Sequence, residues 1–375
     1  MKSLLSLTVA LLILVPGALY AQTDPAEQDQ IQWTDEQTEK LDKYIESAVE
    51  EEQFNGSVLI GIDGEIVYEK VVGFRDINEE QELTFDSSFR LASVSKQFTA
   101  TAIMILAEQG KLDYDDDIRE YLPTIPYEGV TIRHLLHHTG GISDYMMVMG
   151  LTWDQGTPAE DKETAYNHDV VETFSERNPP VVFEPGEKQQ YSNTGYVLLG
   201  QIIINVSGQS LPEFFRSEIF DKLEMTNAHV FATDDSFAPA ERVFGFAFTD
   251  DGHEDNDWHY LNGMVGDGGI YASARDLLKW DQGIQENKLV SAETLQQAFT
   301  PGTTNDGESF PYGFGWVIES DEEGNTVGVQ HSGGWVGFVT YIERDLETNV
   351  TVVVLSNNSG DGFGKVLRGV SSIVE

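Results

Sequence analysis

The sequence predicts an α/β fold in which one antiparallel sheet is assembled from both ends of the chain, flanked by helices, with a mostly helical region inserted between the ends. β-Rich runs bounded by turn residues occur in residues 45–112 and again in residues 271–375, whereas residues 113–270 read as helical segments separated by Pro and Gly loops. Because each element must cover its apolar face, we expect a cleft where the helical region meets the sheet.

The composition supports an ordinary folded domain with an acidic surface. The chain has 375 residues, of which 40% are hydrophobic and 11% aromatic, enough to build a sizeable core. Lys and Arg total 22 against 64 Asp and Glu, a formal net charge of −42, which repels nucleic acid and anionic lipid. The acids are spread along the chain, which favours a solvated surface over an acidic metal site. With no cysteine, disulfides and thiolate metal sites are excluded.

The amino-terminal 21 residues resemble a secretory signal peptide. Lys2 supplies the positive start, residues 4–15 form an apolar run, and small residues end at Ala21. This run is too short to span a bilayer. We therefore expect an exported protein of the periplasm or the extracellular space that is not an integral membrane protein. Residues 22–44 read as a polar tail that runs into an amphipathic helix around residues 36–52, and residues 45–375 as the folded domain.

Local patterns place the first strands and a central helix. The stretch "GSVLIGIDGEIVYEKVVGF" contains two β-rich runs around Asp63-Gly64, which predicts a hairpin. Residues 93–109 predict a helix that ends before Gly110, a residue suited to the left-handed position after a helix. Four further strands are predicted near the carboxyl end, at residues 312–320, 325–334, 337–345 and 349–358.

Ser93 and Lys96 open this central helix and lie three residues apart, so they share one helix face. The positive end of the helix dipole and desolvation both favour the neutral amine, which could take the serine proton. Backbone N–H groups at the helix start could also stabilise an oxyanion. The alternative is a serine N-cap followed by a lysine that reaches solvent, and the pair alone does not decide between them.

Other routes to hydrolysis find less support. The chain lacks a G-x-S-x-G elbow and an H-E-x-x-H motif. His253 and His259 lie among acids in residues 250–259, which we interpret as a mobile acidic loop because the spacing matches no calcium loop. The histidines of one further segment lack a zinc pattern and are interpreted as polar groups that anchor a loop, with one of them near a cleft; these are His134, His137 and His138. No cofactor or metal is expected.

Three short motifs then occur in a telling order: "SVSK" at residues 93–96, "YSN" at 191–193 and "HSG" at 331–333. This order resembles the S-x-x-K, [SY]-x-N and [KH]-[ST]-G motifs of the serine β-lactamase and penicillin-binding protein superfamily. The tyrosine in the second motif is similar to the branch of class C β-lactamases, D-Ala-D-Ala carboxypeptidases, esterases and D-aminopeptidases. Flanking segments such as "TIRHLLHHTGGISDY" and "GDGGIYASARDLLKW" extend the likeness. A second "YLN" at 260–262 lacks the setting of the YSN motif and is interpreted as leading into the GDGG turn, which the resemblance implies lines the cleft from the sheet side.

The resemblance implies a role for each residue of the first two motifs. Ser93 would attack the substrate carbonyl, and Lys96 would act as the general base. Tyr191 would share the proton relay and donate to the leaving group, while Asn193 would hold Lys96 and the substrate amide. The superfamily uses these groups to form and hydrolyse an acyl-enzyme.

The third motif would supply the strand that edges the cleft. His331 stands where the family uses a cation or donor to meet a substrate carboxylate, followed by Ser332 and Gly333. The backbone N–H groups of Ser93 and Gly334 would form the oxyanion hole. Drug-hydrolysing class C enzymes usually have lysine in place of His331, and an imidazole is largely neutral at pH 7, which argues against efficient β-lactam hydrolysis.

We therefore expect an exported serine hydrolase that forms an acyl-enzyme on an amide or ester. The expected substrate is a small molecule or short peptide, with peptidoglycan-derived peptides among the candidates. A class C-like β-lactamase and a non-catalytic wall- or peptide-binding module on the same fold remain as alternatives. The loop at residues 144–165, with its methionines and Trp153, could form either an apolar acyl site or a packed lid. The substrate and the oligomeric state stay open.

Overall fold

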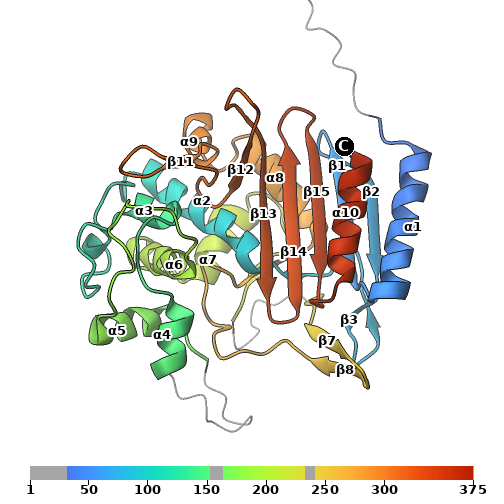
Figure 1. Cartoon of the computed structure of the whole chain (residues 1–375), viewed down its shortest axis with the longest axis horizontal. Coiled ribbons are helices and arrows are strands. Elements are labelled where there is room, and N and C mark those ends of the chain that lie inside the picture. Colours follow the sequence, from blue (N-terminus) through green and yellow to red (C-terminus); the bar gives the residue numbers. More distant parts are fainter. Residues whose placement is uncertain (1–31, 153–163, 233–240, 375) are drawn as a thin grey trace, which may run out of the picture. The chain divides into compact units, whose positions relative to one another are not determined.

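The computed structural model describes residues 32–152, 164–232 and 241–374, which are built around a six-stranded antiparallel sheet (Figure 1). The strand order is β12-β13-β14-β15-β1-β2, so the pairing of β1 with β15 joins the two ends of the chain. This confirms the predicted assembly of one sheet from both termini. The six strands are β1 (Gly56–Ile62), β2 (Glu65–Val72), β12 (Val317–Ser320), β13 (Thr326–Trp335), β14 (Phe338–Asp345) and β15 (Val350–Ser356).

The hairpin between β1 and β2 turns at the predicted dipeptide. Asp63 has φ 50° and Gly64 has φ 82°, the left-handed conformations that a tight two-residue turn of this kind requires. A side chain on Gly64 would collide with Gln282. The turn therefore favours glycine chiefly for its backbone conformation, because the Gln282 amide that a Cβ would meet is the end of a flexible side chain.

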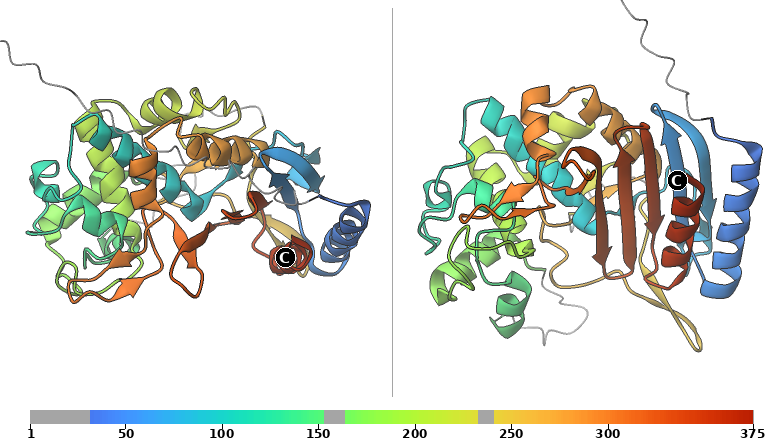
Figure 2. Two further views of the ribbon diagram at one scale, coloured as in Figure 1. Left: turned by 90° about the horizontal axis from the view of Figure 1, so that it is seen from above. Right: turned by 45° about the horizontal axis from the view of Figure 1, so that its top comes forward.

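One face of the sheet is covered by the first and last helices, α1 (Asp35–Glu52) and α10 (Gly362–Val374), which pack side by side in Figures 1 and 2. Leu41 and Ile45 of α1 are completely buried against this face. The side chain of Thr34 caps the helix by accepting from the backbone of Gln37. The helix expected around residues 36–52 is thus present as α1, and residues 35–44 belong to the packed fold and not to the polar tail expected at residues 22–44. The expected signal peptide at residues 1–21 lies outside the described residues.

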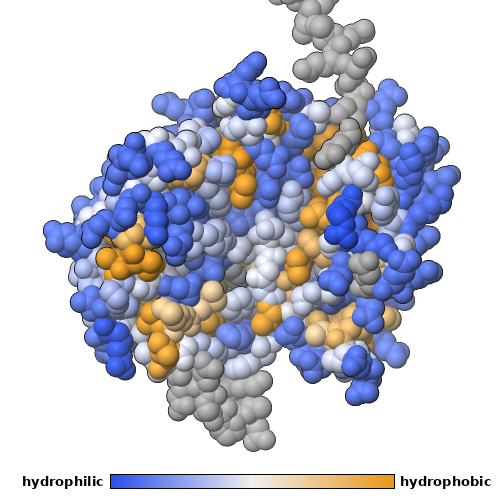
Figure 3. Space-filling model, in the orientation of Figure 1, coloured by the Kyte–Doolittle hydropathy of each residue, from blue (hydrophilic) through white to orange (hydrophobic). Residues whose placement is uncertain are grey.

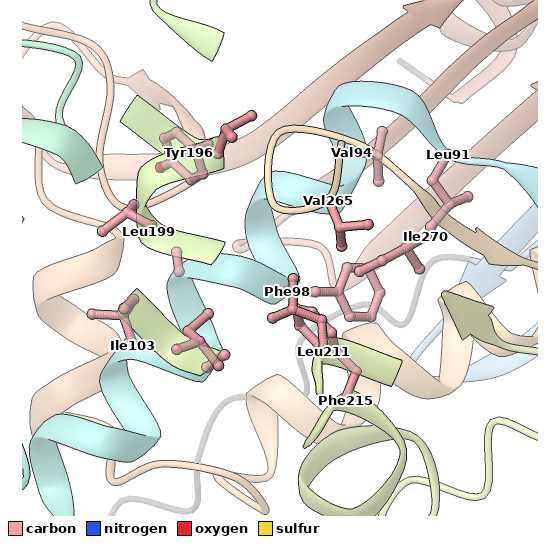
Figure 4. Packing of buried hydrophobic residues seen from close by; sticks show 14 of the residues in the cluster. Leu91, Val94, Phe98, Ile103, Tyr196, Leu199, Leu211, Phe215, Val265 and Ile270 are labelled. Carbon is pink, nitrogen blue, oxygen red and sulfur yellow. The ribbon is translucent and has the colours of Figure 1, made fainter. Parts of the chain in front are cut away.

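The central helix α2 (Ser95–Glu108) and α8 (Ala274–Gln285) pack on the opposite face of the sheet. Residues 95–106 of α2 are all buried, and the ring of Phe98 stacks on Trp280 at 3.9 Å between centroids. Figure 4 shows how this helix sits among apolar side chains from several parts of the chain. The predicted helix at residues 93–109 is thus confirmed as α2, which follows a single helical turn at Ala92–Val94.

The regular structure of the inserted region, residues 113–270, is mainly helical, although loops and turns make up more than half of its described residues, and α2 packs against its helix α6. Residues 250–259 are not a mobile acidic loop, because strand β8 pairs with β7 in a hairpin there. The helices of this region and the following one are α3 (Ile132–Leu136), α4 (Tyr145–Thr152), α5 (Asn167–Arg177), α6 (Asn193–Ser207), α7 (Leu211–Phe215) and α9 (Ala292–Ala298). The short strands are β3 (Phe74–Asp76), β4 (Gln81–Glu82), β5 (Phe89–Arg90), β6 (His229–Val230), β7 (Phe246–Thr249), β8 (Gly252–Asp255), β9 (Ile270–Ala272), β10 (Gly302–Thr303) and β11 (Ser309–Phe310). Single turns of helix occur at Ala92–Val94, Ile118–Glu120 and Arg216–Phe220.

The surface follows from the acidic composition. The face shown in Figure 3 is largely hydrophilic, with smaller hydrophobic patches. Within the part of the chain that the structure describes, no helix is both long and apolar enough to cross a membrane.

A buried ion pair ties α8 to the sheet. Asp281 of α8 meets Arg344 of β14, and their side chains are only 4% and 5% exposed. The hydroxyl of Thr351 on β15 donates to the same carboxylate at 2.7 Å, and Arg344 also donates to Asn349 at 2.8 Å. Because both charges lie out of water, each depends on the other for its stability.

Replacing Arg344 with Met should therefore lower the free energy of unfolding by about 3–5 kcal/mol, because it leaves the Asp281 carboxylate buried without its cation. Urea unfolding measures this loss. Lys288→Met, which breaks a pair that is more than half exposed, is the control and should cost less than about 1 kcal/mol. A loss from Arg344→Met as small as the control's would contradict this account, as would a double Asp281→Leu/Arg344→Met variant that is no more stable than the single one.

Candidate active site

Ser93 lies at a strained turn where β5 passes into α2. The residue before it, Ala92, has φ 48°, a left-handed conformation that non-glycine residues rarely adopt. This turn presents Ser93 at the start of α2 and at the wall of a small pocket of about 30 Å³. The pocket is lined by Arg90, Ala92, Ser93, Tyr145, Asn193, Leu261, Met264, Asp267, Gly268, Gly334 and Trp335.

Strand β13 runs close against this turn, and glycine permits the approach. A Cβ on Gly333 would lie 3.0 Å from the backbone nitrogen of Ser93 and would collide with the carbonyl oxygen of Leu91. The same carbonyl accepts a hydrogen bond of 2.7 Å from Thr340 on the neighbouring strand. Gly334 consequently lines the same pocket as Ser93, where the sequence analysis expected an oxyanion hole.

Lys96 does not reach solvent but is completely buried beside Ser93. Its Nζ donates to Oδ1 of Asn193 at 2.8 Å and to the carbonyl oxygen of Asp267 at 2.8 Å, and it lies 3.0 Å from Oγ of Ser93. In its ammonium form, Nζ donates a hydrogen bond to each of these three oxygens. A neutral amine keeps the first two bonds and turns its lone pair to the Ser93 hydroxyl, the arrangement that a general base requires.

Tyr191 and Asn193 reach this cluster together because α6 begins at Asn193. The ring centroid of Tyr191 lies 4.9 Å from Lys96 Nζ, and the side chain is 44% exposed. His138 packs on the Tyr191 ring at 4.4 Å between centroids, and its Nδ1 accepts from the backbone N–H of Ser192 at 3.1 Å. His138 therefore anchors the YSN segment, consistent with the loop-anchoring role expected for the histidines of this region.

His331 lies next to this cluster, but it is not among the residues that line the pocket. Its Nδ1 is 2.6 Å from the carbonyl oxygen of Ser332, and its Nε2 is 3.0 Å from the hydroxyl of Tyr312. Because a carbonyl can only accept, Nδ1 carries the proton and Nε2 accepts from Tyr312. Burial, reinforced by the nearby charge of Lys96, lowers the pKa of His331 to about 3.

The structure thus gives His331 neither a charge at neutral pH nor a free N–H for a substrate carboxylate, which differs from the role that the resemblance implied. His331 instead fixes Tyr312 against the strand. The next residues alternate as a strand requires, with Ser332 exposed, Gly333 buried and Gly334 exposed. Of the eight residues expected in the site, Ser93, Lys96, Tyr191 and Asn193 come directly together, and the four of the third motif lie along β13 beside them.

Further residues that line the pocket, among them Asp267, Arg90 and Trp335, were not identified from the sequence. Asp267 accepts a hydrogen bond of 3.0 Å from the Tyr145 hydroxyl, and burial raises the pKa of the Asp267 carboxyl. Arg90 is only 3% exposed and donates to the carbonyl oxygen of Asn262 at 3.1 Å. Asn262 also accepts from the Trp335 indole at 2.8 Å, so the second "YLN" supports the pocket wall. Only the expected position of the GDGG turn at the cleft hinted at Asp267.

Metal ligation finds no support in the part of the chain that the structure describes, where no three His, Asp or Glu side chains are grouped so that they could hold an ion. His253 instead contacts Asn78 at 3.2 Å, and Nδ1 of His259 accepts from the backbone of Leu261. The polar groups that the structure brings to the pocket and its edge are the hydroxyl, amine, phenol and amide groups described above, together with the Asp267 carboxyl group and the Arg90 guanidinium.

The depressed pKa of His331 predicts a contribution to acid sensitivity. Between about pH 6.5, the ordinary value, and pH 3, the unfolded chain binds a proton at this residue and the folded protein does not, so stability falls as pH falls. On going from pH 7 to pH 5, His331→Gln should lose about 2 kcal/mol less unfolding free energy than the unaltered protein. His168→Gln, at a side chain that is 69% exposed, is the control. If the His331 variant and the unaltered protein lost the same unfolding free energy between pH 7 and pH 5, this assignment would be contradicted.

Comparisons with known proteins agree with this geometry. Residues 41–370 match the Beta-lactamase family. Penicillin-binding protein 4* of Bacillus subtilis (strain 168) is 37% identical over 334 residues, covering 86% of this chain and 72% of the relative. A D-aminopeptidase of Gluconobacter oxydans (strain 621H) is 27% identical, over 81% of this chain and 55% of its own length.

Among solved structures, the crystal structure of a penicillin binding protein from Bacillus halodurans superposes with a TM-score of 0.74 and 27% identity, covering 89% of this chain and 98% of that one. The family match spans most of the chain, and the relative from Bacillus subtilis exceeds 30% identity. The chain therefore belongs to the Beta-lactamase family, within the superfamily of serine β-lactamases and penicillin-binding proteins.

Proposed function

We propose that this protein is an exported serine hydrolase that forms an acyl-enzyme on an amide or ester substrate. The observation that carries the proposal is the buried amine of Lys96, which lies 3.0 Å from the Ser93 hydroxyl while two other acceptors hold it in place. A buried lysine is costly unless its charge or its lone pair is used, and here it faces a nucleophile at the wall of a pocket.

In the acylation step, Oγ of Ser93 attacks the substrate carbonyl as its proton passes to Nζ of Lys96. The backbone N–H groups of Ser93 and Gly334 stabilise the negative charge on the carbonyl oxygen. Tyr191 then relays the proton to the leaving amine or alcohol, so that the scissile bond breaks and an ester to Ser93 remains. Water activated by Lys96 and Tyr191 hydrolyses this ester and restores the free serine.

The alternatives are weaker on specific grounds. A class C-like β-lactamase needs a partner for the β-lactam carboxylate, and both nitrogens of His331 are already engaged. A non-catalytic binding module has no physical use for a lysine that is completely buried beside a serine. The D-aminopeptidase relative supports a peptidase or amidase, whereas the penicillin-binding relative supports a carboxypeptidase-like activity.

The test of catalysis is covalent labelling of Ser93 by a fluorophosphonate, together with hydrolysis of a panel of p-nitrophenyl esters, D-Ala-D-Ala peptides and nitrocefin. Ser93→Ala should abolish labelling and hydrolysis. Lys96→Met should slow acylation by roughly 10²- to 10⁴-fold, the usual worth of a positioned base. Ser309→Ala, at an exposed serine outside the pocket, is the matched control and should behave like the unaltered protein.

Labelling that persists in Ser93→Ala would contradict the proposal, as would an unaltered protein that neither reacts nor hydrolyses any substrate. Nitrocefin turnover faster than ester and peptide turnover would instead favour the β-lactamase alternative.

Export is proposed from the amino-terminal pattern alone, a positive start followed by an apolar run that ends at Ala21. Expressed in a bacterial host, the full chain should lose this amino-terminal segment and be recovered outside the cytoplasm, and the first residue of the recovered protein gives the cleavage site. Amino-terminal sequencing of the recovered protein measures this. Recovery of an uncleaved chain from the cytoplasm would contradict export without affecting the proposed chemistry.

A further inference from the structure

The pocket beside Ser93 has an acidic wall that the proposed acylation chemistry does not use. Asp267 lies in the turn that precedes β9, where its carbonyl oxygen holds Lys96 and its side chain lines the pocket. Tyr145 stands at the start of α4 and donates to one oxygen of the Asp267 carboxylate at 3.0 Å. The position of Tyr145 is fixed because its backbone N–H donates to Thr194 of α6 at 2.8 Å. The carboxylate is therefore oriented rather than free to swing.

This carboxylate is buried without a direct cationic partner. Asp267 is 8% exposed, and among the ion pairs of the described residues none includes it. Burial raises the pKa of the carboxyl, while Lys96, the Tyr145 hydrogen bond and Arg90 act in the opposite direction. A buried carboxylate that has lost its water gains most from a ligand that brings a positive charge with N–H donors.

Arg90 does not fill this role. Its guanidinium lies between the faces of Phe231, Tyr271 and Trp335, at 5.4, 5.8 and 5.8 Å from the ring centroids. It donates to the carbonyl oxygen of Asn262 and forms no ion pair within the described part of the chain. The positive charge of Arg90 partly stabilises the Asp267 carboxylate. Arg90 donates no hydrogen bond to that carboxylate.

The position of Asp267 relative to the reacting groups indicates which part of a substrate it meets. If Tyr191 passes the proton to the leaving group, the leaving group points toward Tyr191, which does not line the pocket. The acyl part of the substrate then enters the pocket, where Met264 and Leu261 offer apolar contacts and Asp267 offers the charge.

We propose that Asp267, oriented by Tyr145, is a specificity-determining residue that binds a primary ammonium group on the acyl side of the substrate. This rests on the proposed serine hydrolase function and narrows its substrates to amides and esters of amino acids or peptides with a free amino terminus. The ammonium forms a charge-assisted hydrogen bond with the carboxylate, and an N-acylated substrate loses both the charge and that bond.

The test compares D-alanine p-nitroanilide, which has a free ammonium, with its N-acetyl derivative, by the ratio of their kcat/KM values. In the unaltered protein the ratio should favour the ammonium substrate. Asp267→Asn should lower this ratio by about 10- to 100-fold, the usual effect of losing a hydrogen bond to a charged group. Asp267→Glu, which keeps the charge, should retain part of the preference. The use of a ratio cancels any effect of the substitutions on Lys96.

Two further measurements do not depend on a variant. The KM for the ammonium substrate should rise above about pH 8, where an α-amino group loses its proton, while the KM for the N-acetyl derivative should not follow this change. D-Alaninamide should protect Ser93 from fluorophosphonate labelling at lower concentrations than N-acetyl-D-alaninamide does.

These experiments distinguish failure of the Asp267 inference from failure of the proposed serine hydrolase function. Hydrolysis that depends on Ser93, with a ratio that is the same in Asp267→Asn and the unaltered protein, would overturn this inference and leave the proposed function intact. Equal protection by the two amides would also overturn it. Absence of any reaction at Ser93 would instead overturn the proposed function on which the inference rests.

Discussion

The burial of one lysine beside one serine is the constraint on which the site depends. Lys96 belongs to a helix whose residues 95–106 are all out of contact with water, so its amine can be satisfied only by groups brought from elsewhere. Those groups are Asn193 from the start of α6 and the carbonyl of Asp267 from the turn before β9. The inserted region, which supplies both groups, must therefore be in place before the amine can face Ser93.

The remaining architecture keeps this cluster accessible from one side. Strand β13 approaches the turn at Ser93 because residue 333 is glycine, and α6 delivers Tyr191 and Asn193 together. The strained conformation of Ala92 presents the serine at the pocket wall. The sheet thus supplies the rigid edge, the inserted region supplies the polar partners, and the reacting groups meet at the boundary.

Much of this arrangement was predictable, because it follows from local patterns in the sequence. The Asp63-Gly64 turn, the central helix and the strands near the carboxyl end follow from turn chemistry and periodicity. The first two motifs predicted the residues that the structure brings together around Lys96. The hydrogen bonds of His331, the pairing of Asp267 with Tyr145 and the packing of residues 35–44 on the sheet were not predictable. These depend on contacts between distant segments, which no local pattern records. The acidic hairpin at 246–255 was missed because charged residues disfavour strands on propensity alone.

The most direct test of the central claim is chemical rescue of a protein that lacks the Lys96 side chain. In Lys96→Ala, added small primary amines such as methylamine should restore fluorophosphonate labelling of Ser93 in proportion to amine concentration, because they enter the vacated space and take the serine proton as the phosphorus–oxygen bond forms and fluoride leaves. The same amines should not restore Ser93→Ala. A folded Lys96→Ala protein that acylates at the unaltered rate without amine, or that no amine accelerates, would contradict the claim that Lys96 is the base.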